Sequence, residues 1–443
     1  MIPLNTAPLR VALVPLIRPL FRGARLGLDR SALSELSPLQ GKLGIALEAF
    51  SPVTDAAEAQ AARERLLASP PDLLLVLYVT FATSDLLLPL LSSGLPAALW
   101  ALPEAWEEGP LPQNALCGLN LGLSLDHPGP VKWIYGAASD PRVHRALQVT
   151  AGALRARQLL TRGKLLWLGG PAPGFDAFSA LPDFGLQVER VDHAPLWEAL
   201  SQVDRDQVEQ LLAEAEPVQD QQAERSLIAL ELALLRLSHG YDGVALREWP
   251  EIPDRLGLMP YRSVSRLAEA GLICATEGDL LGLASMLALQ RVGGTPPLLL
   301  DLVHLSEKGL MVWHAGEAAP SWREPGSALR VLPHFNRGLP AMHDLTLRSG
   351  PVSGLRLLPR AAAVYGGRLS GQRGFDGDAG WLAETSWSGE SLSPEQFLTS
   401  WLNRRLPHHL PLIAGEHQET LLELCDWLSL PVLPASCGRT LIR

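Results

Sequence analysis

Paired cysteines are missing from this 443-residue sequence. Its four cysteines (Cys117, Cys274, Cys425 and Cys437) form no CxxC pair and no cluster with histidine, which argues against a disulfide framework or a structural zinc site. Basic residues are fewer than acidic ones: charged residues make up an ordinary 19% of the chain, and 37 basic against 47 acidic side chains give a formal net charge of −10. Because phosphate binding needs Lys and Arg gathered on one face, we expect no nucleic-acid partner.

Segments for export or membrane insertion are missing as well. Arg10 and Arg18 interrupt the first apolar stretch and prolines divide it, so we predict no signal peptide and a reducing cytoplasm as the location. The apolar run between Asp85 and Glu104 is nominally long enough to span a membrane. Pro and Gly residues divide this run into a buried helix followed by a buried strand, so we expect no membrane association.

The common motifs of nucleotide-binding and hydrolytic enzymes are also missing. The chain has no GxxxxGK[ST] phosphate loop, no GxGxxG dinucleotide fingerprint, no GxSxG elbow and no HExxH motif. The glycine-rich segment Gly169–Gly174 has the wrong spacing for a dinucleotide site. Kinases, NAD-dependent dehydrogenases and serine hydrolases therefore lose their usual sequence support.

What the sequence does contain is an alternation of short apolar runs and helical patterns. Five runs predict strands in the N-terminal part of the chain: Arg10–Leu16, Gly44–Phe50, Asp72–Thr80, Ala97–Leu102 and Val131–Tyr135. The segment Ala56–Ala68 between them carries apolar residues at helical spacing, and the same alternation begins again near Lys164. Such an order predicts parallel sheets covered by helices on both faces.

The predicted fold class is α/β, with two doubly wound parallel-sheet domains followed by a small β-rich, barrel-like domain. We place the first domain at residues 1–160, the second at residues 161–325 and the third at residues 326–443. From about Glu324, short β-like runs separated by Gly, Pro and Ser replace the strand–helix alternation, which is typical of a small antiparallel sheet or barrel.

Acidic and histidine side chains stand at the ends of apolar runs in the second domain. Glu277 follows one such run, Asp301 follows three leucines, and His314 ends another run. Because the carboxyl ends of strands in an open α/β sheet face the ligand crevice, these side chains can converge there. Each also has a structural alternative, as a solvated loop residue for Glu277 and as a hydrogen-bonded core histidine for His314. Asp279 begins a helical pattern, so we predict that it caps a helix.

Two adjacent histidines, His408 and His409, precede the apolar run Leu410–Ala414. Neighbouring residues of a strand point to opposite faces, so at most one of the two is expected to face a given site. Two carboxylates and a histidine that are distant in sequence are a weak metal signal by spacing alone.

Taken together, these segments resemble the L-fucose isomerase and L-arabinose isomerase superfamily. The segment Ala275–Asp279, then Gly294-Thr295-Pro296, then Leu300-Asp301 is similar to the family's ATE(N/G)D, TGT and AD motifs in order and spacing. The run from His409 to Gly415 resembles the family's terminal metal-histidine region, and the WHAG sequence that contains His314 is similar to a strand-end histidine of the arabinose isomerase branch.

The resemblance implies a metal-dependent aldose–ketose isomerase of a pentose or a 6-deoxyhexose, working through a cis-enediol. It implies that Glu277, Asp301 and His409 hold Mn²⁺ or Mg²⁺ and that the two carboxylates also move protons. Substrate contacts are expected from a set of nearby residues, namely His314, His408, and Trp249 and Glu251 in the segment LREWPE. The family's assembly implies a homo-oligomer, a trimer or hexamer, in which a neighbouring subunit's first domain covers the metal site.

The chemistry of the reaction is consistent with this ligand set. Moving a proton between C2 and C1 of a sugar requires a base and stabilisation of a weakly acidic carbon. Two carboxylates and one imidazole suit Mn²⁺ or Mg²⁺ and leave coordination positions for sugar oxygens. Two alternatives stay open, a catalytically silent sugar-binding homologue and a two-lobed cytoplasmic sugar sensor, and stoichiometric Mn²⁺ binding would favour the isomerase.

Overall fold

The computed structural model describes residues 7–127, 129–178, 180–181, 183–214 and 220–436. Cys437, one of the four cysteines considered above, lies outside these residues. The chain divides into two compact units. The first unit ends at Arg155 and the second begins at Ala156, within helix α6 (Pro141–Leu160). The further division of the second unit at residue 325 stays a prediction.

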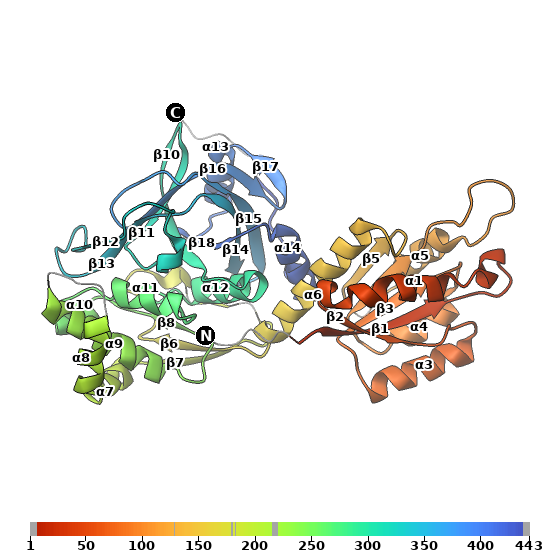
Figure 1. The fold of residues 1–443 in the computed structure, drawn as a ribbon, viewed down its shortest axis with the longest axis horizontal. Helices are drawn as coiled ribbons and strands as arrows, with labels where there is room; N and C mark the ends of the chain where they lie inside the picture. The colour runs from red at the N-terminus through yellow and green to blue at the C-terminus, as the bar shows by residue number, and fades with distance from the viewer. Residues whose placement is uncertain (1–6, 128, 179, 182, 215–219, 437–443) are drawn as a thin grey trace. The chain divides into compact units, whose positions relative to one another are not determined.

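The first unit is built on a five-stranded parallel sheet in the order β2-β1-β3-β4-β5. Its strands are β1 (Leu9–Leu16), β2 (Ile45–Ala49), β3 (Leu73–Tyr78), β4 (Ala97–Ala101) and β5 (Val131–Tyr135). The connecting helices, besides α6, are η1 (Arg22–Arg25), α1 (Leu28–Leu36), η2 (Ser37–Leu39), α2 (Gln40–Leu43), α3 (Ala56–Ala68), α4 (Ser84–Leu91) and α5 (Ala115–Leu123). The strand order reverses at β1, which places helices on both faces of the sheet (Figure 1).

The second unit begins with a four-stranded parallel sheet in the order β7-β6-β8-β9. Its strands are β6 (Lys164–Leu168), β7 (Gln187–Val191), β8 (Gly243–Leu246) and β9 (Ile273–Ala275). The helices around it are η3 (Asp176–Phe178), α7 (Ala194–Ser201), α8 (Arg205–Glu214), α9 (Gln221–Leu237), α10 (Glu251–Leu256), α11 (Tyr261–Glu269) and α12 (Leu280–Gly293). The order reverses between β6 and β8, where an open α/β sheet forms its ligand crevice.

The rest of the second unit forms a β-barrel. Six strands pair in a closed ring, because β11-β10-β18-β14-β15-β16 are hydrogen-bonded in turn and β16 pairs back with β11. These strands are β10 (Leu298–Ser306), β11 (Gly309–His314), β14 (Gly350–Leu358), β15 (Ala361–Leu369), β16 (Asp378–Trp387) and β18 (His409–Ala414). Around the ring lie β12 (Arg330–Leu332), β13 (Met342–Thr346), β17 (Glu390–Leu392), η4 (Pro320–Trp322), α13 (Pro394–Asn403) and α14 (Gln418–Trp427). The predicted fold class of parallel sheets followed by a barrel-like region is confirmed.

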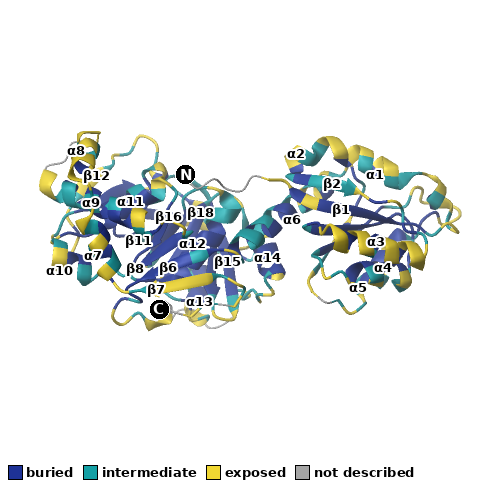
Figure 2. Cartoon of the chain, turned by 90° about the horizontal axis from the view of Figure 1, so that it is seen from below, coloured by how far each residue is buried: buried dark blue, intermediate teal, exposed yellow. Residues whose placement is uncertain are grey.

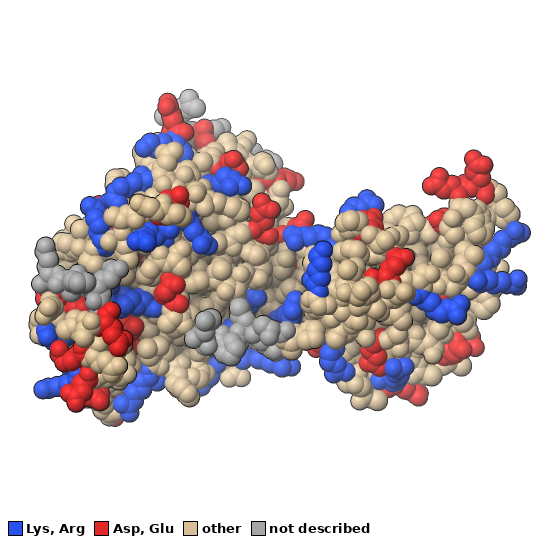
Figure 3. Space-filling model, viewed as in Figure 1, with Lys and Arg blue, Asp and Glu red and all other residues tan. Residues whose placement is uncertain are grey.

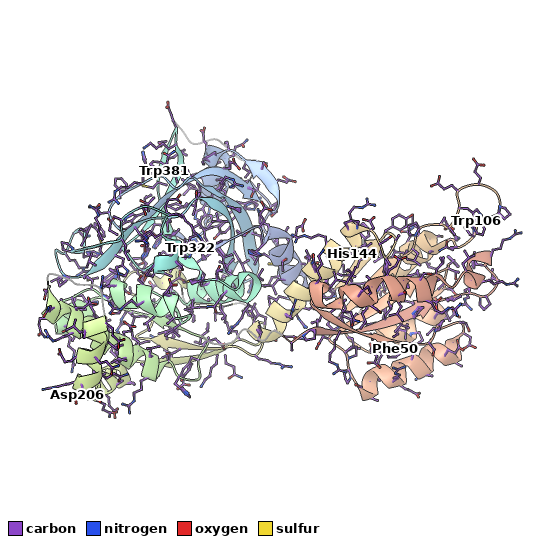
Figure 4. All side chains as sticks on the ribbon, viewed as in Figure 1. Phe50, Trp106, His144, Asp206, Trp322 and Trp381 are labelled. Carbon is purple, nitrogen blue, oxygen red and sulfur yellow. The ribbon has the colours of Figure 1, made fainter. Side chains whose placement is uncertain are left out.

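Burial follows from this arrangement. Every residue of β3, β4 and β8 is buried, as expected for interior parallel strands, and Figure 2 shows exposed residues gathered on the outer faces of helices such as α3 and α8. In the second unit, Trp322, which is labelled in Figure 4, is buried, and its indole N–H donates to the Pro296 carbonyl over 2.8 Å.

Helix α12 connects the parallel sheet to the barrel and is buried from Leu280 to Leu289. A helix that is apolar on all sides needs partners on all sides, and α12 packs against β8 and β9 of the sheet and against β14 and β18 of the barrel. Asp279 is its N-cap and accepts a hydrogen bond from the Gly282 N–H over 2.7 Å, so the predicted cap is confirmed.

Among the described residues, no helix is both long enough and apolar enough to cross a membrane.

Candidate metal centre

One end of the barrel meets the carboxyl edge of the second parallel sheet, and the predicted site residues gather there. Glu277 follows β9, whereas Asp301 lies within β10, His314 ends β11 and His409 begins β18. The prediction that Glu277, Asp301 and His314 all stand at the ends of parallel strands was therefore right only for Glu277. The apolar runs before Asp301 and His314 form strands as predicted, but these pair antiparallel within the barrel.

The main chain of Glu277 is held in an unusual conformation. Its φ is +58°, in the left-handed region that residues with a side chain seldom adopt, and Gly278 follows at φ +66°. The Glu277 N–H donates to Glu248 Oε2 over 2.6 Å, and its carbonyl accepts from the Ala172 N–H over 2.9 Å. A Cβ at Gly278 would come within 2.0 Å of the Gly170 carbonyl oxygen, so this close approach requires glycine. These contacts fix the direction of the Glu277 side chain.

His409 is fully buried and is oriented by a second carboxylate. Its Nδ1 lies 2.8 Å from Asp279 Oδ2, which also accepts from Arg356 Nη1 over 2.8 Å. With Nδ1 committed to Asp279, the other ring nitrogen, Nε2, is directed at Glu277 Oε2 over 3.4 Å and at Asp301 Oδ1 over 3.7 Å. A carboxylate behind the imidazole is the usual way in which proteins orient a metal-binding histidine.

The charges of these groups reinforce one another. Burial by itself would lower the pKa of His409, but Asp279, Glu277 and Asp301 raise it to about 10. Burial would likewise raise the pKa of Glu277, but contacts with His408 and His409 hold that pKa well below its usual range. The carboxylates thus create a strongly negative field at His409, which a divalent cation would neutralise.

The donor atoms fit a cation in composition and spacing. Ligand atoms of Glu277, His408 and His409 all lie within 4.8 Å of one another, and so do those of Asp301, His314 and His409. Within the described part of the chain, the buried atoms Glu277 Oε2 and Asp301 Oδ1 accept no hydrogen bond. Buried carboxylate oxygens are costly without a partner, so their convergence on His409 favours a metal site.

The adjacent histidines do not behave as predicted. The ring centroids of His408 and His409 are 4.3 Å apart, and His408 Nε2 lies 3.5 Å from Glu277 Oε2 and 3.9 Å from Asp301 Oδ1. The expectation that only one of them faces the site was wrong. The alternation of side chains applies within a strand, whereas β18 begins at His409 and leaves His408 in the preceding loop.

His314 is buried beside the cluster. Its ring centroid is 5.5 Å from that of His409, and its Nδ1 lies 3.4 Å from Glu317 Oε1. Burial lowers the pKa of His314, which favours the neutral imidazole that can bind a metal or a sugar hydroxyl. The buried position of His314 is therefore compatible both with a core histidine and with a metal or substrate ligand.

Of the two substrate-binding residues expected from the segment LREWPE, Trp249 lies near the site and Glu251 does not. Trp249 packs on Phe175 with centroids 5.7 Å apart, and Phe175 in turn packs on His408 at 5.5 Å. Glu251 is instead the first residue of α10 and forms an ion pair with Arg247 over 2.5 Å, so the structure does not bring it to the cluster.

Glu248, which was not among the predicted site residues, lies at the site, whereas Glu251 does not. Glu248 is fully buried, accepts from the Glu277 N–H, and accepts from the Tyr261 hydroxyl over 3.2 Å. Burial, followed by the charge of Glu277, raises the pKa of Glu248 to about 8. The signal was present, because Glu248 follows the apolar strand β8 as Glu277 follows β9.

A second missed acid, Glu317, lies behind His314. It accepts from the Thr276 hydroxyl over 2.7 Å, and burial raises its pKa well above the usual range. Asp378, the first residue of β16, accepts from the Ala318 N–H over 2.6 Å and holds the loop that carries Glu317. These buried acids support the main chain and imidazole of the site.

Comparisons with known proteins point to a sugar isomerase. No family model matches the sequence. A sulfoquinovose isomerase of Priestia aryabhattai is 25% identical over 425 residues, which cover 88% of this chain and 92% of the relative. A sulfoquinovose isomerase of Alkalicoccus urumqiensis is 25% identical over 315 residues, which cover 66% of this chain and 70% of the relative. These relatives support an aldose–ketose isomerase of a sugar.

The same relatives do not identify the L-fucose and L-arabinose isomerase superfamily specifically. The relatives are not called fucose or arabinose isomerases, so that resemblance stays a prediction. Among solved structures, an ABC transporter solute-binding protein from Bacillus halodurans C-125 with bound myo-inositol covers 66% of this chain and 91% of its own length at 16% identity. Its TM-score of 0.18 is too low to carry an argument.

The two histidines should differ in their effect on metal binding. His409 is buried and oriented by Asp279, whereas the side chain of His408 is 45% exposed. We expect His409→Ala to weaken Mn²⁺ binding by at least about 100-fold, because it removes a buried ligand that a second carboxylate orients. We expect His408→Ala to weaken it by about tenfold or less, because this side chain is partly exposed to water. Titration of each purified variant with Mn²⁺ measures the difference, and equal or reversed losses would contradict it.

Glu248 should act on the metal site through the Glu277 main chain. We expect Glu248→Ala to lower Mn²⁺ affinity by about 10- to 100-fold, because the Glu277 N–H loses its acceptor and the strained loop its support. Glu248→Gln keeps an acceptor oxygen and should retain most of the affinity. If both variants lost affinity equally, the charge of Glu248 and not its hydrogen bond would matter.

Proposed function

We propose that this chain is a metal-dependent aldose–ketose isomerase that interconverts a 6-deoxyhexose and its ketose through a cis-enediol. The observation that supports the proposal is the convergence of Glu277 Oε2, Asp301 Oδ1 and His409 Nε2 from three separate elements. The sulfoquinovose isomerase relatives support the reaction class, and the carboxylate and histidine donor atoms support the metal dependence. The narrower relation to fucose and arabinose isomerases belongs to this proposal.

The residues present fit a hard divalent cation such as Mn²⁺ or Mg²⁺. Glu277 and Asp301 would supply carboxylate oxygens and His409 an imidazole nitrogen, with His408 and His314 within reach as further ligands or substrate contacts. When bound, such a cation polarises a carbonyl and stabilises the negative charge that develops on its oxygen.

Glu277 and Asp301 are also the bases that the reaction needs. One carboxylate takes the proton from C2 of the aldose, and a proton is returned to C1 of the resulting cis-enediol while hydrogen moves from the C2 oxygen to the C1 oxygen. Each of the two carboxylates has one oxygen at the cluster, and His408 Nε2 lies 3.5 Å from Glu277 Oε2 and 3.9 Å from Asp301 Oδ1. The exchange is internal to the sugar and consumes no other reactant.

Aromatic side chains at the rim give the sugar an apolar surface. Phe175 packs on His408 and Trp249 packs on Phe175, while Trp313 stacks near His314 with centroids 6.2 Å apart. Aromatic rings suit the C–H faces of a sugar and help to exclude water from a reactive enediol.

The proposed substrate follows the relatives. Sulfoquinovose is a glucose in which a sulfonate replaces the C6 hydroxyl, so it is itself a 6-deoxyhexose of the class expected from the sequence. We propose a substrate of this kind and a cytoplasmic location for the enzyme.

A homo-oligomer, a trimer or hexamer, is part of the proposal. The loops at the carboxyl edge of the first sheet and the start of α5 expose apolar side chains that a monomer leaves in water, namely Leu20, Leu26, Trp106, Leu111 and, in α5, Leu116. Trp106 is labelled on one of these loops in Figure 4, and the Gly23 N–H ties the loop after β1 to the Pro112 carbonyl on the loop after β4. On the face shown in Figure 3, basic and acidic side chains are intermingled. The expected lack of a nucleic-acid partner stays a prediction.

Asp301→Asn tests the metal proposal. A neutral amide is a poor ligand for a hard cation, so we expect the variant to keep its fold but lose Mn²⁺ binding and ketose formation by at least about 100-fold. Asp426→Asn, at an exposed position of α14, is the matched control. Mn²⁺ content and circular dichroism of both proteins are measured, and wild-type Mn²⁺ content in Asp301→Asn would remove Asp301 from the site.

Light scattering tests the proposed assembly. We expect the purified protein at micromolar concentration to have three or six times the mass of the 47.9 kDa chain, because association covers the apolar loops of the first unit. Leu111→Asp, which places a charge in the middle of that surface, should shift the mass towards the monomer. A fully active monomer in the wild-type sample would contradict the proposal.

A further inference from the structure

The segment His334–Gly338 forms a closed loop at the rim of the metal centre. The His334 N–H donates to the Leu339 carbonyl over 2.7 Å, and the Gly338 N–H donates back to the His334 carbonyl over 3.0 Å. The Arg337 N–H donates to His334 Nδ1 over 3.3 Å. These hydrogen bonds close the loop on itself.

Two side chains of this loop pack on aromatic residues that touch a site histidine. The His334 ring stacks on Tyr261 with centroids 5.6 Å apart, and Phe335 meets Trp313 edge-on at 5.0 Å. Tyr261 and Trp313 each lie beside His314, at centroid distances of 6.3 and 6.2 Å. The loop is therefore one aromatic ring away from the cluster, although Phe335 itself is 57% exposed.

A third side chain, Arg337, lies near another aromatic residue of the site, Trp249. Its guanidinium carbon lies 5.8 Å from the ring centroid of Trp249, which contacts Phe175 and, through it, His408. Among the described residues, no carboxylate forms an ion pair with Arg337, whereas the nearby Arg247 is paired with Glu251. Arg337 thus presents a positive charge on an aromatic surface beside the site.

We propose that the loop His334–Gly338 contacts the end of the sugar remote from the metal and that Arg337 binds an anionic substituent there. The inference rests on the proposed function, which places the C1–C2 end of the sugar at Glu277 and Asp301. An anionic group is repelled by those carboxylates, so it is bound with its charge directed away from them. A planar guanidinium held on Trp249 matches the oxygens of a sulfonate and donates more than one hydrogen bond to them.

The proposal names a substrate class and one residue that selects it. The class is a 6-deoxyhexose with a sulfonate on C6, the chemistry that the relatives' substrate carries. Arg337 then determines specificity but takes no part in moving protons. Its removal should affect binding and turnover of the charged sugar far more than those of the uncharged sugar.

The experiment compares sulfoquinovose with 6-deoxyglucose, which has the same ring and no sulfonate. Wild-type protein, Arg337→Met and Arg337→Lys are assayed with Mn²⁺ for ketose formation from both sugars. Methionine keeps an aliphatic chain on Trp249 and removes the charge, and lysine keeps the charge without the planar fork. Arg360→Met, which removes an exposed arginine from the turn between β14 and β15, is the matched control.

We expect Arg337→Met to lower kcat/KM for sulfoquinovose by about 10- to 100-fold, mainly through KM, with a loss at least tenfold smaller for 6-deoxyglucose. Arg337→Lys should recover part of the loss, and Arg360→Met should match the wild type. Equal kcat/KM of the wild type for the two sugars, or equal losses on both in Arg337→Met, would overturn the inference and leave the isomerase intact. Failure of the wild type to isomerise either sugar would instead remove the proposed function, and this inference with it.

Discussion

The carboxylate of Asp279 joins three segments that lie far apart in the sequence. It caps α12, pairs with the buried Arg356 of β14 and orients His409 at the start of β18. Burial by itself would raise the pKa of Asp279, but Arg356 and His409 hold that pKa below its usual range. A buried ion pair stabilises little on balance, yet removal of one partner leaves an uncompensated charge that costs roughly 3–5 kcal/mol. This triad therefore contributes more to the geometry of the fold than to its net stability, and the direction of His409 Nε2 depends on it.

The site combines one residue on a loop, Glu277, with two residues on barrel strands, Asp301 and His409. Glu277 stands on a loop after β9 in a left-handed conformation, whereas Asp301 and His409 are paired residues of two barrel strands. A cation needs ligand atoms placed to within a few tenths of an ångström, which barrel strands provide without further help. The loop reaches similar precision only because Glu248, Ala172 and Gly278 restrain it. This difference explains why so many buried polar groups lie on the sheet side of the cluster.

Much of the fold was predictable from local sequence patterns, and the site was predictable in part. The apolar runs ending near Asp301 and His314 indicated strands correctly, but an apolar run does not reveal its pairing partner, so their place in the barrel could not be inferred. His408 was misjudged because the first residue of a strand is not marked in the sequence. Glu248 and Glu251 look alike as acids near an apolar strand. Only the start of α10 at Glu251, which pairs it with Arg247, separates the structural acid from the one at the site.

The proposed chemistry and the proposed specificity reside on different parts of the second unit. The proposed metal ligands come from the loop after β9 and from β10 and β18, which the Asp279 triad and α12 hold together, while the sugar's far end would meet a loop that is bonded mainly to itself. Substitutions in the loop can change the charge presented on Trp249 without disturbing a ligand, because the contacts between loop and centre are ring packing and not hydrogen bonds to the ligands. Changes near Asp279 have no such freedom, since one carboxylate serves a helix, an ion pair and an imidazole together. A sugar isomerase built this way can acquire a new substrate through its rim while its proton chemistry stays the same.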